Sequence, residues 1–273
     1  MDIQQIIHRT VQLFSPIPAV EAIVLGGSRA TGTALPTSDL DIGIYYNRAL
    51  LDYTALNLAA AQLDDQHRPG LIWEEGGWGN WMNFGGWLKV DGCATDLIFR
   101  DMNRVRKELK RTADGICQPH YQTGHPHAYL NVMYRGELAC CQVLYRRHPE
   151  FDRLKAEAEE YPEPMRRSLL EFFLFEAGFS ASFVEKYAGS GDISYCYGHL
   201  YRSVAALNQA LFAWGRTYCL NEKKAVQRIE QLGLWPDYQN RVRELFETEA
   251  SDPHKAACLL LDLVAEVQQH CQN

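Results

Sequence analysis

Two aspartates lie one residue apart behind a glycine–serine turn in the segment VLGGSRATGTALPTSDLDIGIYY, residues 24–46. Asp39 and Asp41 begin an apolar stretch that alternates as a strand does, so both side chains should project from one face, roughly 6.5–7 Å apart. Two like charges on one face repel each other unless a cation lies between them. Magnesium is the obvious cation, because it binds one or two carboxylates together with the phosphates of a substrate.

The turn itself, Gly26-Gly27-Ser28, has the composition of a phosphate-binding loop. Glycine lets the backbone approach a ligand closely. A helix opening at Ser28 would direct free N–H groups and the serine hydroxyl towards phosphates. The residues of this region predicted to bind nucleotide or phosphate are Gly27, Ser28, Arg29, Thr33 and Ser38.

A third acid, Asp96, lies in the apolar stretch GCATDLIFRD, where a charge is costly without a partner. If this stretch forms a strand beside that of Asp39 and Asp41, three carboxylates converge. Two of them can hold metal on a triphosphate, while the third ligates a second metal or takes the proton of an acceptor. We therefore predict Asp39, Asp41 and Asp96 as the catalytic and metal-binding residues.

The order Gly-Ser, Asp-x-Asp in a strand and a later strand aspartate resembles the nucleotidyltransferase superfamily of the polymerase-beta type. The resemblance rests on Gly27, Ser28, Asp39, Asp41 and Asp96. The overall plan, an α/β part followed by a helical part, is similar to that of the aminoglycoside and other antibiotic nucleotidyltransferases. The resemblance implies an enzyme of the EC 2.7.7 type that binds ATP or another nucleoside triphosphate and Mg²⁺, with two ions expected.

The reaction that this resemblance implies is transfer of a nucleoside monophosphate, usually AMP, to a hydroxyl, with release of pyrophosphate. The leading hypothesis is a small hydroxylated acceptor, of which an aminoglycoside-like antibiotic is one example. A second hypothesis is a protein hydroxyl, as in antitoxin-like members, although these are usually minimal single domains. A third is a nucleotide-binding module without transfer activity.

The residues around these motifs predict an α+β fold: a nucleotidyltransferase-like domain with a small mixed sheet flanked by helices, over residues 1–148. Helices are expected near 2–13 and 49–63 and from Asp101, with strands near 20–26, 39–46, 81–90 and 94–99. The last two strands should form a hairpin at Asp91-Gly92. From residue 149 to 273 the pattern predicts an all-α helical bundle.

Within the helical part, Met165–Tyr187 is apolar nearly all round, which predicts a buried helix. Glu171 and Glu176 lie on it, and an acid buried there needs a partner such as Arg202. By the antibiotic-enzyme resemblance, either glutamate is also a candidate general base. Lys223, in the segment LNEKK, is a candidate triphosphate contact or an exposed residue at a helix start.

The segment EEGGWGNWMNFGGW, residues 74–87, allows two interpretations. Its tryptophans either fill the core or form an aromatic wall for a nucleobase or acceptor. Glu74 or Glu75 would in the second case bind a cationic acceptor. His125 and His127 are interpreted as loop residues, with a role between the two domains as the alternative.

Charge, apolar runs and cysteine spacing argue against several other classes of protein. Lys and Arg number 27 and Asp and Glu 34, so the formal net charge is −7, which makes nucleic acid an unexpected partner. The N-terminus lacks the pattern of a signal peptide, and no apolar run approaches a membrane span, so a cytoplasmic protein is expected. The eight cysteines form no CxxC pair and are interpreted as reduced thiols. A homodimer is compatible with the sequence.

Overall fold

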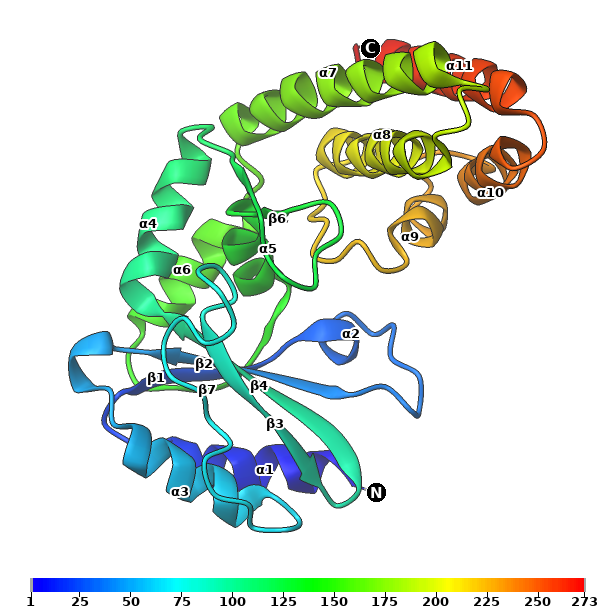
Figure 1. The fold of residues 1–273 in the computed structure, drawn as a ribbon. Helices are drawn as coiled ribbons and strands as arrows, with labels where there is room; N and C mark the ends of the chain where they lie inside the picture. Colours follow the sequence, from blue (N-terminus) through cyan, green and yellow to red (C-terminus); the bar gives the residue numbers. More distant parts are fainter. Residues whose placement is uncertain (1, 273) are drawn as a thin grey trace. The chain divides into compact units, whose positions relative to one another are not determined.

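The structure, a computed structural model, describes residues 2–272 and divides the chain into two compact units (Figure 1). The first unit contains the residues up to Arg111, together with Gln118–Gly124 and Tyr129–Glu160. The second contains Thr112–Cys117, His125–Ala128 and the residues from Tyr161 onward. The α+β prediction, with a mixed sheet in the N-terminal part and a helical C-terminal part, is confirmed.

The first unit is built on a five-stranded sheet in the order β3-β4-β2-β1-β7. Strands β2 and β4 are parallel, and every other neighbouring pair is antiparallel, so the sheet is mixed. A second, two-stranded sheet pairs β5 with β6. The strands are β1 (Val20–Leu25), β2 (Leu40–Tyr46), β3 (Phe84–Val90), β4 (Cys93–Asp101), β5 (Pro119–His120), β6 (Tyr129–Leu130) and β7 (Gln142–Arg146).

Alternation along the strands separates the two faces of this sheet. Leu40, Ile42 and Ile44 of β2 are buried in a core that includes residues of α1 (Ile3–Phe14) and α3 (Tyr53–Leu63), which lie together on one face (Figure 1). On the other face, Tyr45 packs in a second core with residues of three more helices. These are α4 (Met102–Ala113), α5 (Val132–Cys140) and α6 (Glu150–Glu159).

Side-chain caps determine where several elements begin. The Asp52 carboxylate accepts hydrogen bonds from the Thr54 and Ala55 N–H groups, so α3 begins at Tyr53 and not near Ala49 as predicted. The Asp101 carboxylate accepts from Asn103 N–H at the start of α4, as predicted. Asp91 and Gly92, with φ of 48° and 78°, turn β3 into β4, so the predicted hairpin is confirmed.

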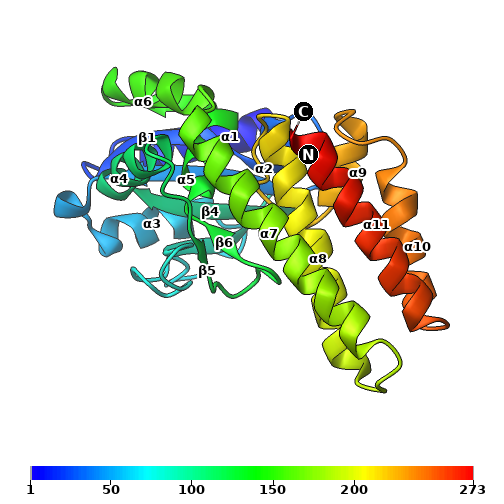
Figure 2. The same cartoon turned by 90° about the horizontal axis from the view of Figure 1, so that it is seen from above.

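The second unit is helical, with α7, α8 and α11 running alongside one another (Figure 2). The prediction that Met165–Tyr187 is buried all round was wrong: Phe172, Phe175 and Phe179 are exposed, because only one face of α7 packs on α8 and α11. The helices are α7 (Glu163–Tyr187), α8 (Ile193–Trp214), α9 (Ala225–Gln231), α10 (Tyr238–Glu249) and α11 (Pro253–Gln272).

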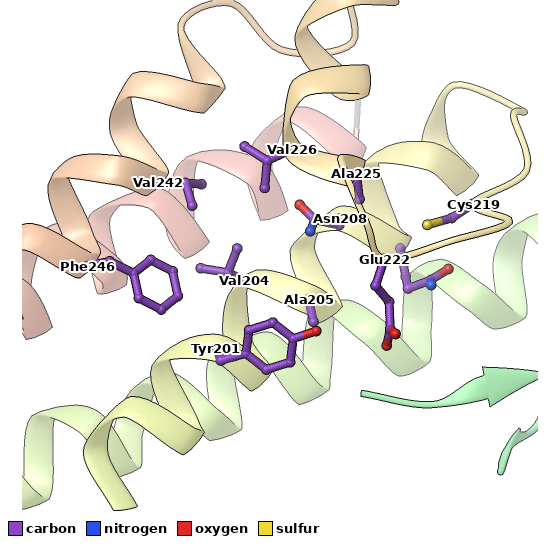
Figure 3. A pocket seen from close by; sticks show the side chains of 11 residues that line it. Tyr201, Val204, Ala205, Asn208, Cys219, Glu222, Ala225, Val226, Val242 and Phe246 are labelled. Carbon is purple, nitrogen blue, oxygen red and sulfur yellow. The ribbon is translucent and has the colours of Figure 1, made fainter. Parts of the chain in front are cut away.

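A cavity of about 250 Å³ lies within this unit, among α8, α9, α10 and the segment that precedes α9 (Figure 3).

None of the helices described over residues 2–272 combines the length and apolarity needed to cross a bilayer. All eight cysteines are free thiols.

Candidate active site

The first feature of the site is the register of three neighbouring strands. Asp41 of β2 is paired with Asp96 of β4, and Asp96 is paired with Trp87 of β3. Residues paired in this way project from the same face of a sheet, on strands ~4.8 Å apart. The two predicted acids and an indole ring therefore form one row across the sheet, on the face opposite the core of α1 and α3.

The glycine turn lies directly against this row. Gly26 N–H donates to the carbonyl oxygen of Asp41 at 2.8 Å, and Gly27 has φ of 58°. A Cβ at Gly27 would clash with the carboxylate of Asp41, so only glycine combines this backbone conformation with this approach. The turn and the acid are therefore in contact, as a site that holds a phosphate and its cation requires.

The helix expected to open at Ser28 is a single turn, α2 (Gly27–Ala30), which begins one residue earlier. A helix this short has little macrodipole, so any contribution to phosphate binding comes from its individual N–H groups and the Ser28 hydroxyl. Ser28 carbonyl oxygen accepts from Thr33 N–H at 2.9 Å, and the Thr33 hydroxyl lies 3.0 Å from that of Thr31. These bonds close the loop on itself.

Arg29 and Ser38 order the segment that carries Asp39. The Arg29 guanidinium donates to the carbonyl oxygens of Asp39 at 3.1 Å and Ser38 at 2.5 Å. The Ser38 hydroxyl oxygen accepts from Leu35 N–H at 2.9 Å. Asp39 is exposed and precedes β2. Arg29 thus fixes the backbone of the loop through these contacts, which differ from the phosphate contact that the sequence predicts.

The carboxyl groups of the row lie close together and repel one another when they are charged. Partial burial, then the neighbouring charges of Asp41 and Asp39, raise the pKa of Asp96 to about 6. No lysine, arginine or histidine within the described chain forms an ion pair with Asp96. The carboxyl group is therefore partly protonated near neutral pH, and a cation bound here would favour its charged form.

The donor set of the row suits magnesium, because it offers carboxylate oxygens whose mutual repulsion a hard cation would offset. Over residues 2–272, no three His, Cys, Asp or Glu side chains are grouped so that they could hold a metal ion by themselves. Magnesium usually takes only one or two carboxylates, with the remaining ligands from water and substrate phosphates. The residues present fit a cation of that kind, held jointly with a triphosphate.

Trp87 continues the row as an exposed aromatic surface. It stacks on Trp78 with ring centroids 4.5 Å apart and contacts Trp73 edge-on at 6.4 Å. The Trp78 ring approaches Gly85 of β3 so closely that a Cβ there would clash with it. Trp73 and Trp87 are half exposed, whereas Trp81 is stacked on His120 at 3.9 Å. Trp81 thus packs against its neighbours, and an aromatic wall at Trp87 for a nucleobase or acceptor stays a prediction.

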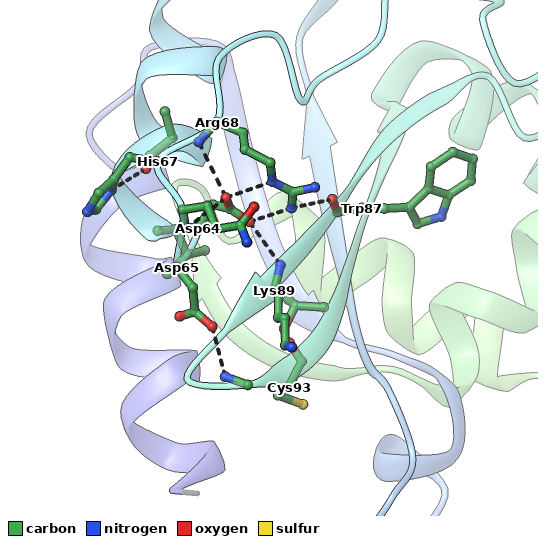
Figure 4. Close-up of polar contacts among 12 residues, drawn as sticks. Asp64, Asp65, His67, Arg68, Trp87, Lys89 and Cys93 are labelled. Carbon is green, nitrogen blue, oxygen red and sulfur yellow. Dashed lines mark hydrogen bonds and ion pairs between the residues drawn. The ribbon is translucent and has the colours of Figure 1, made fainter.

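Asp64, another acid of the first unit, is surrounded by hydrogen-bond donors, unlike Asp96 (Figure 4). Its side chain is fully buried, and its carboxylate accepts from Arg68 Nε at 2.9 Å and Nη2 at 2.6 Å. Lys89 N–H adds a hydrogen bond at 3.0 Å. The bonds from Arg68 hold the pKa of Asp64 well below its usual range, against the effect of burial. Asp64 ties the end of α3 to β3 and is structural.

The candidate bases of the second unit differ from each other. Glu176 is buried and forms ion pairs with Arg202 and, at 3.3 Å, with His127. Burial raises its pKa, but His127 and Arg202 outweigh that effect and lower it, which weakens Glu176 as a base. Glu171 is exposed, so the prediction that it is buried was wrong. Lys223 is exposed, with its N–H donating to Asn221 Oδ1 at 2.8 Å.

Two further candidates, Glu75 and His125, contact residues of their own units. Glu75 accepts from the Tyr46 hydroxyl at 2.5 Å and pairs with Arg48 at 2.9 Å, whereas Glu74 is exposed. His125 Nδ1 lies 3.8 Å from Glu222 Oε2. Sequence reasoning did not identify Glu222, or the pairing of Trp87 with Asp96, because both depend on which segments become neighbours.

In comparison with known proteins, one family model matches part of the chain. Residues 3–75 match the model of the nucleotidyltransferase domain, a segment that includes Gly27, Ser28, Asp39 and Asp41. Among solved structures, the nucleotidyltransferase-like protein from Exiguobacterium sibiricum 255-15 aligns with 98% of this chain and 75% of its own. The identity is 10% and the TM-score is 0.48. A search of curated proteins found no match.

Proposed function

We propose, from the match of residues 3–75 to the nucleotidyltransferase domain model, that the chain moves a nucleoside monophosphate, AMP in the first instance, from a triphosphate to a hydroxyl of a small acceptor. The observation that carries this proposal is the pairing of Asp41 with Asp96 on adjacent strands, beside the Gly27 turn. Acids paired on adjacent strands, close enough for Asp41 to raise the pKa of Asp96, and next to a close-approach glycine favour a metal–phosphate ligand over a structural role.

On the donor side, the N–H groups of Gly27 and Ser28 and the Ser28 hydroxyl bind phosphate oxygens. Asp39 and Asp41 are the residues that would hold magnesium, which when bound polarises phosphoryl oxygens and offsets their charge. Arg29 keeps Asp39 in place through its bonds to the backbone carbonyls of residues 38 and 39. The chain's own contribution is thus to fix the triphosphate against the end of β2.

At the reacting centre, Asp96 accepts the proton of the acceptor hydroxyl. The hydroxyl oxygen forms a bond to the α-phosphorus as the bond from that phosphorus to the β-bridging oxygen breaks, and pyrophosphate leaves. A base whose pKa is about 6 combines an available deprotonated form with useful basicity near neutral pH. Asp96 as ligand of a second ion is the alternative, and it predicts that Asp96→Asn also weakens magnesium-dependent donor binding.

The acceptor approaches from the β3 edge. The lateral order is the Gly27 turn, Asp41, Asp96 and Trp87, so Trp87 with Trp78 lies on the side of Asp96 away from the phosphates. An exposed indole beside carboxylates suits an acceptor with a flat or cationic ring. Trp87→Ala should raise the acceptor KM about tenfold and leave the donor Kd unchanged, with Trp87→Phe retaining part of the affinity.

The deciding experiment measures thermal stability with each nucleoside triphosphate, with and without magnesium. A ligand at a hundred times its Kd stabilises the folded state by about 2.7 kcal/mol. We expect a magnesium-dependent rise in Tm for the wild type and for Asp65→Asn, an exposed acid outside the row. The double variant Asp39→Asn/Asp41→Asn should lose it, and the absence of any rise in the wild type contradicts the proposal.

Activity is then measured as pyrophosphate release over a panel of hydroxylated acceptors that includes aminoglycosides. Binding of a triphosphate without release over the whole panel would favour the nucleotide-binding module without transfer. A mass increase of one AMP on co-expressed proteins would favour a protein acceptor.

A further inference from the structure

The cavity of about 250 Å³ in the second unit is lined by α8, α9 and α10 and by the segment that precedes α9 (Figure 3). Every lining residue belongs to this unit, so the cavity does not depend on the first unit. Most of its wall is apolar, from side chains that include Val204, Val226, Val242 and Phe246. Apolar walls with a few polar groups are typical of small-molecule sites.

Two buried carboxamide side chains of α8 contribute polar atoms to the cavity wall. Asn208 and Gln209 are 8% and 7% exposed and both line the cavity. The Tyr238 hydroxyl donates to Asn208 Oδ1 at 2.9 Å, which holds that amide in one orientation. Buried amides usually complete their hydrogen bonds, so amides that line a cavity favour a ligand with polar atoms.

Glu222 is the one charged side chain that the described residues contribute to the wall. Its side chain is 11% exposed, and its Oε1 accepts from His127 N–H at 2.7 Å and Ala128 N–H at 3.1 Å. These bonds orient the carboxylate and occupy one oxygen, and His125 Nδ1 lies 3.8 Å from the other. A carboxylate held in a mostly apolar wall favours a cationic ligand group.

Tyr201 lies beside Glu222 at one end of the cavity, with Val242 and Phe246 at the other (Figure 3). Burial, followed by the charge of Glu222, raises the pKa of Tyr201 to about 12 and that of Cys219 to about 12. Both groups therefore remain neutral. The wall presents one negative charge at one end and an apolar surface at the other.

We propose that this cavity binds a small organic monocation: an amine carried on an aromatic or branched aliphatic body. The ammonium group pairs with Glu222 next to the Tyr201 ring, and the body packs against Val242 and Phe246. A polyhydroxylated polycation would leave most of its polar groups against apolar side chains, so the cavity disfavours it. The proposal requires no nucleotide and is independent of the transfer reaction.

The test is calorimetric titration of the full chain, without nucleotide, using 2-phenylethylamine, isopentylamine, 2-phenylethanol and 3-phenylpropanoate. We expect 2-phenylethylamine to bind at least tenfold more tightly than the alcohol of similar shape, and the acid not to bind. The proposal is overturned if neither amine binds saturably, or if the alcohol or the acid binds as tightly as the amine.

Variants locate the binding. Glu222→Gln keeps an oxygen that accepts from His127 and Ala128 and removes only the charge, so amine affinity should fall at least tenfold. Val226→Phe should abolish binding by filling the cavity, and it remains informative if Glu222→Gln fails to fold. The control, Glu247→Gln, changes an exposed acid of α10 that does not line the cavity. Unchanged affinity in a folded Glu222→Gln or Val226→Phe variant would show that the amine binds elsewhere.

Discussion

Asp64 and Asp96 carry the same carboxyl group in the same unit, yet their surroundings shift its pKa in opposite directions. Asp64 accepts hydrogen bonds from Arg68 and from backbone N–H groups, which lower its pKa despite burial. Asp96 is partly buried beside Asp41, and its pKa rises to about 6. A carboxylate that the fold itself neutralises stabilises the fold, whereas one held beside another acid keeps its proton to a higher pH.

The largest expected effect is on catalysis, from Asp41→Asn. Loss of one carboxylate that we propose to bind magnesium should lower kcat/KM about a thousandfold, because several kcal/mol of transition-state stabilisation would depend on that cation. Pyrophosphate release measures this, with Asp65→Asn as the control. Activity within tenfold of wild type would show that Asp41 is not required for catalysis.

Gly27→Ala tests whether the backbone positions that acid. The new methyl group would clash with the Asp41 carboxylate and would also require a left-handed backbone conformation. We expect kcat/KM to fall about a hundredfold through displacement of Asp41. Gly32→Ala, also at positive φ but with nothing within 4 Å of its Cβ, is the control. Equal activity of the two variants would contradict contact between the turn and the acid as the cause.

Asp64→Asn should affect stability instead of catalysis. Losing a buried acceptor of charge-assisted hydrogen bonds should lower the free energy of unfolding by about 2 kcal/mol at pH 7. Because the pKa of Asp64 is lowered in the folded state, its contribution is complete well above the unfolded pKa of ~3.9 and is lost progressively as pH falls from there through the lower folded pKa. Chemical denaturation at pH 7 and pH 3 measures the difference, and an equal loss at both contradicts an ionic contribution.

On stability, Asp96→Asn gives the smallest effect, with the opposite sign to that of Asp64→Asn. Its raised pKa means that the folded state binds the proton more tightly, so wild-type stability falls as pH rises from about 4 to 6. Removing the charge should stabilise the fold by about 1 kcal/mol at pH 8, after allowance for solvent screening, and by nothing below pH 4. A Tm that drops at pH 8 would show that Asp96 has a structural partner.

The parts of this molecule that sequence reasoning predicted are those with local signals. Strand alternation around Asp41 and the Asp91-Gly92 turn predicted their elements directly, since each depends on a few neighbouring residues. The row of Asp41, Asp96 and Trp87 depends on the parallel pairing of β2 with β4, which only the folded topology determines. Its two acids could be suggested as neighbours, but their register and the indole beside them could not.

Secondary structure and burial were predicted wrongly, or not at all, where the apolar pattern of the sequence does not match the burial of its residues. The 117–146 region, with β5, β6, α5 and β7, has no sustained apolar period, so its elements were not predicted. Helix α7 is apolar on nearly every side, which is typical of a buried helix, yet Phe175 and Phe179 face solvent. Composition alone does not report which faces a neighbouring helix covers.

The parallel pairing of β2 with β4 also sets an order of folding. The β3–β4 hairpin needs only the Asp91-Gly92 turn, whereas β2 can join β4 only after the segment between them has folded back, at an entropic cost of loop closure. During synthesis, β2 is complete long before its partner strand leaves the ribosome. A nascent chain ending before β4 therefore contains the glycine turn, Asp39 and Asp41 but no assembled row.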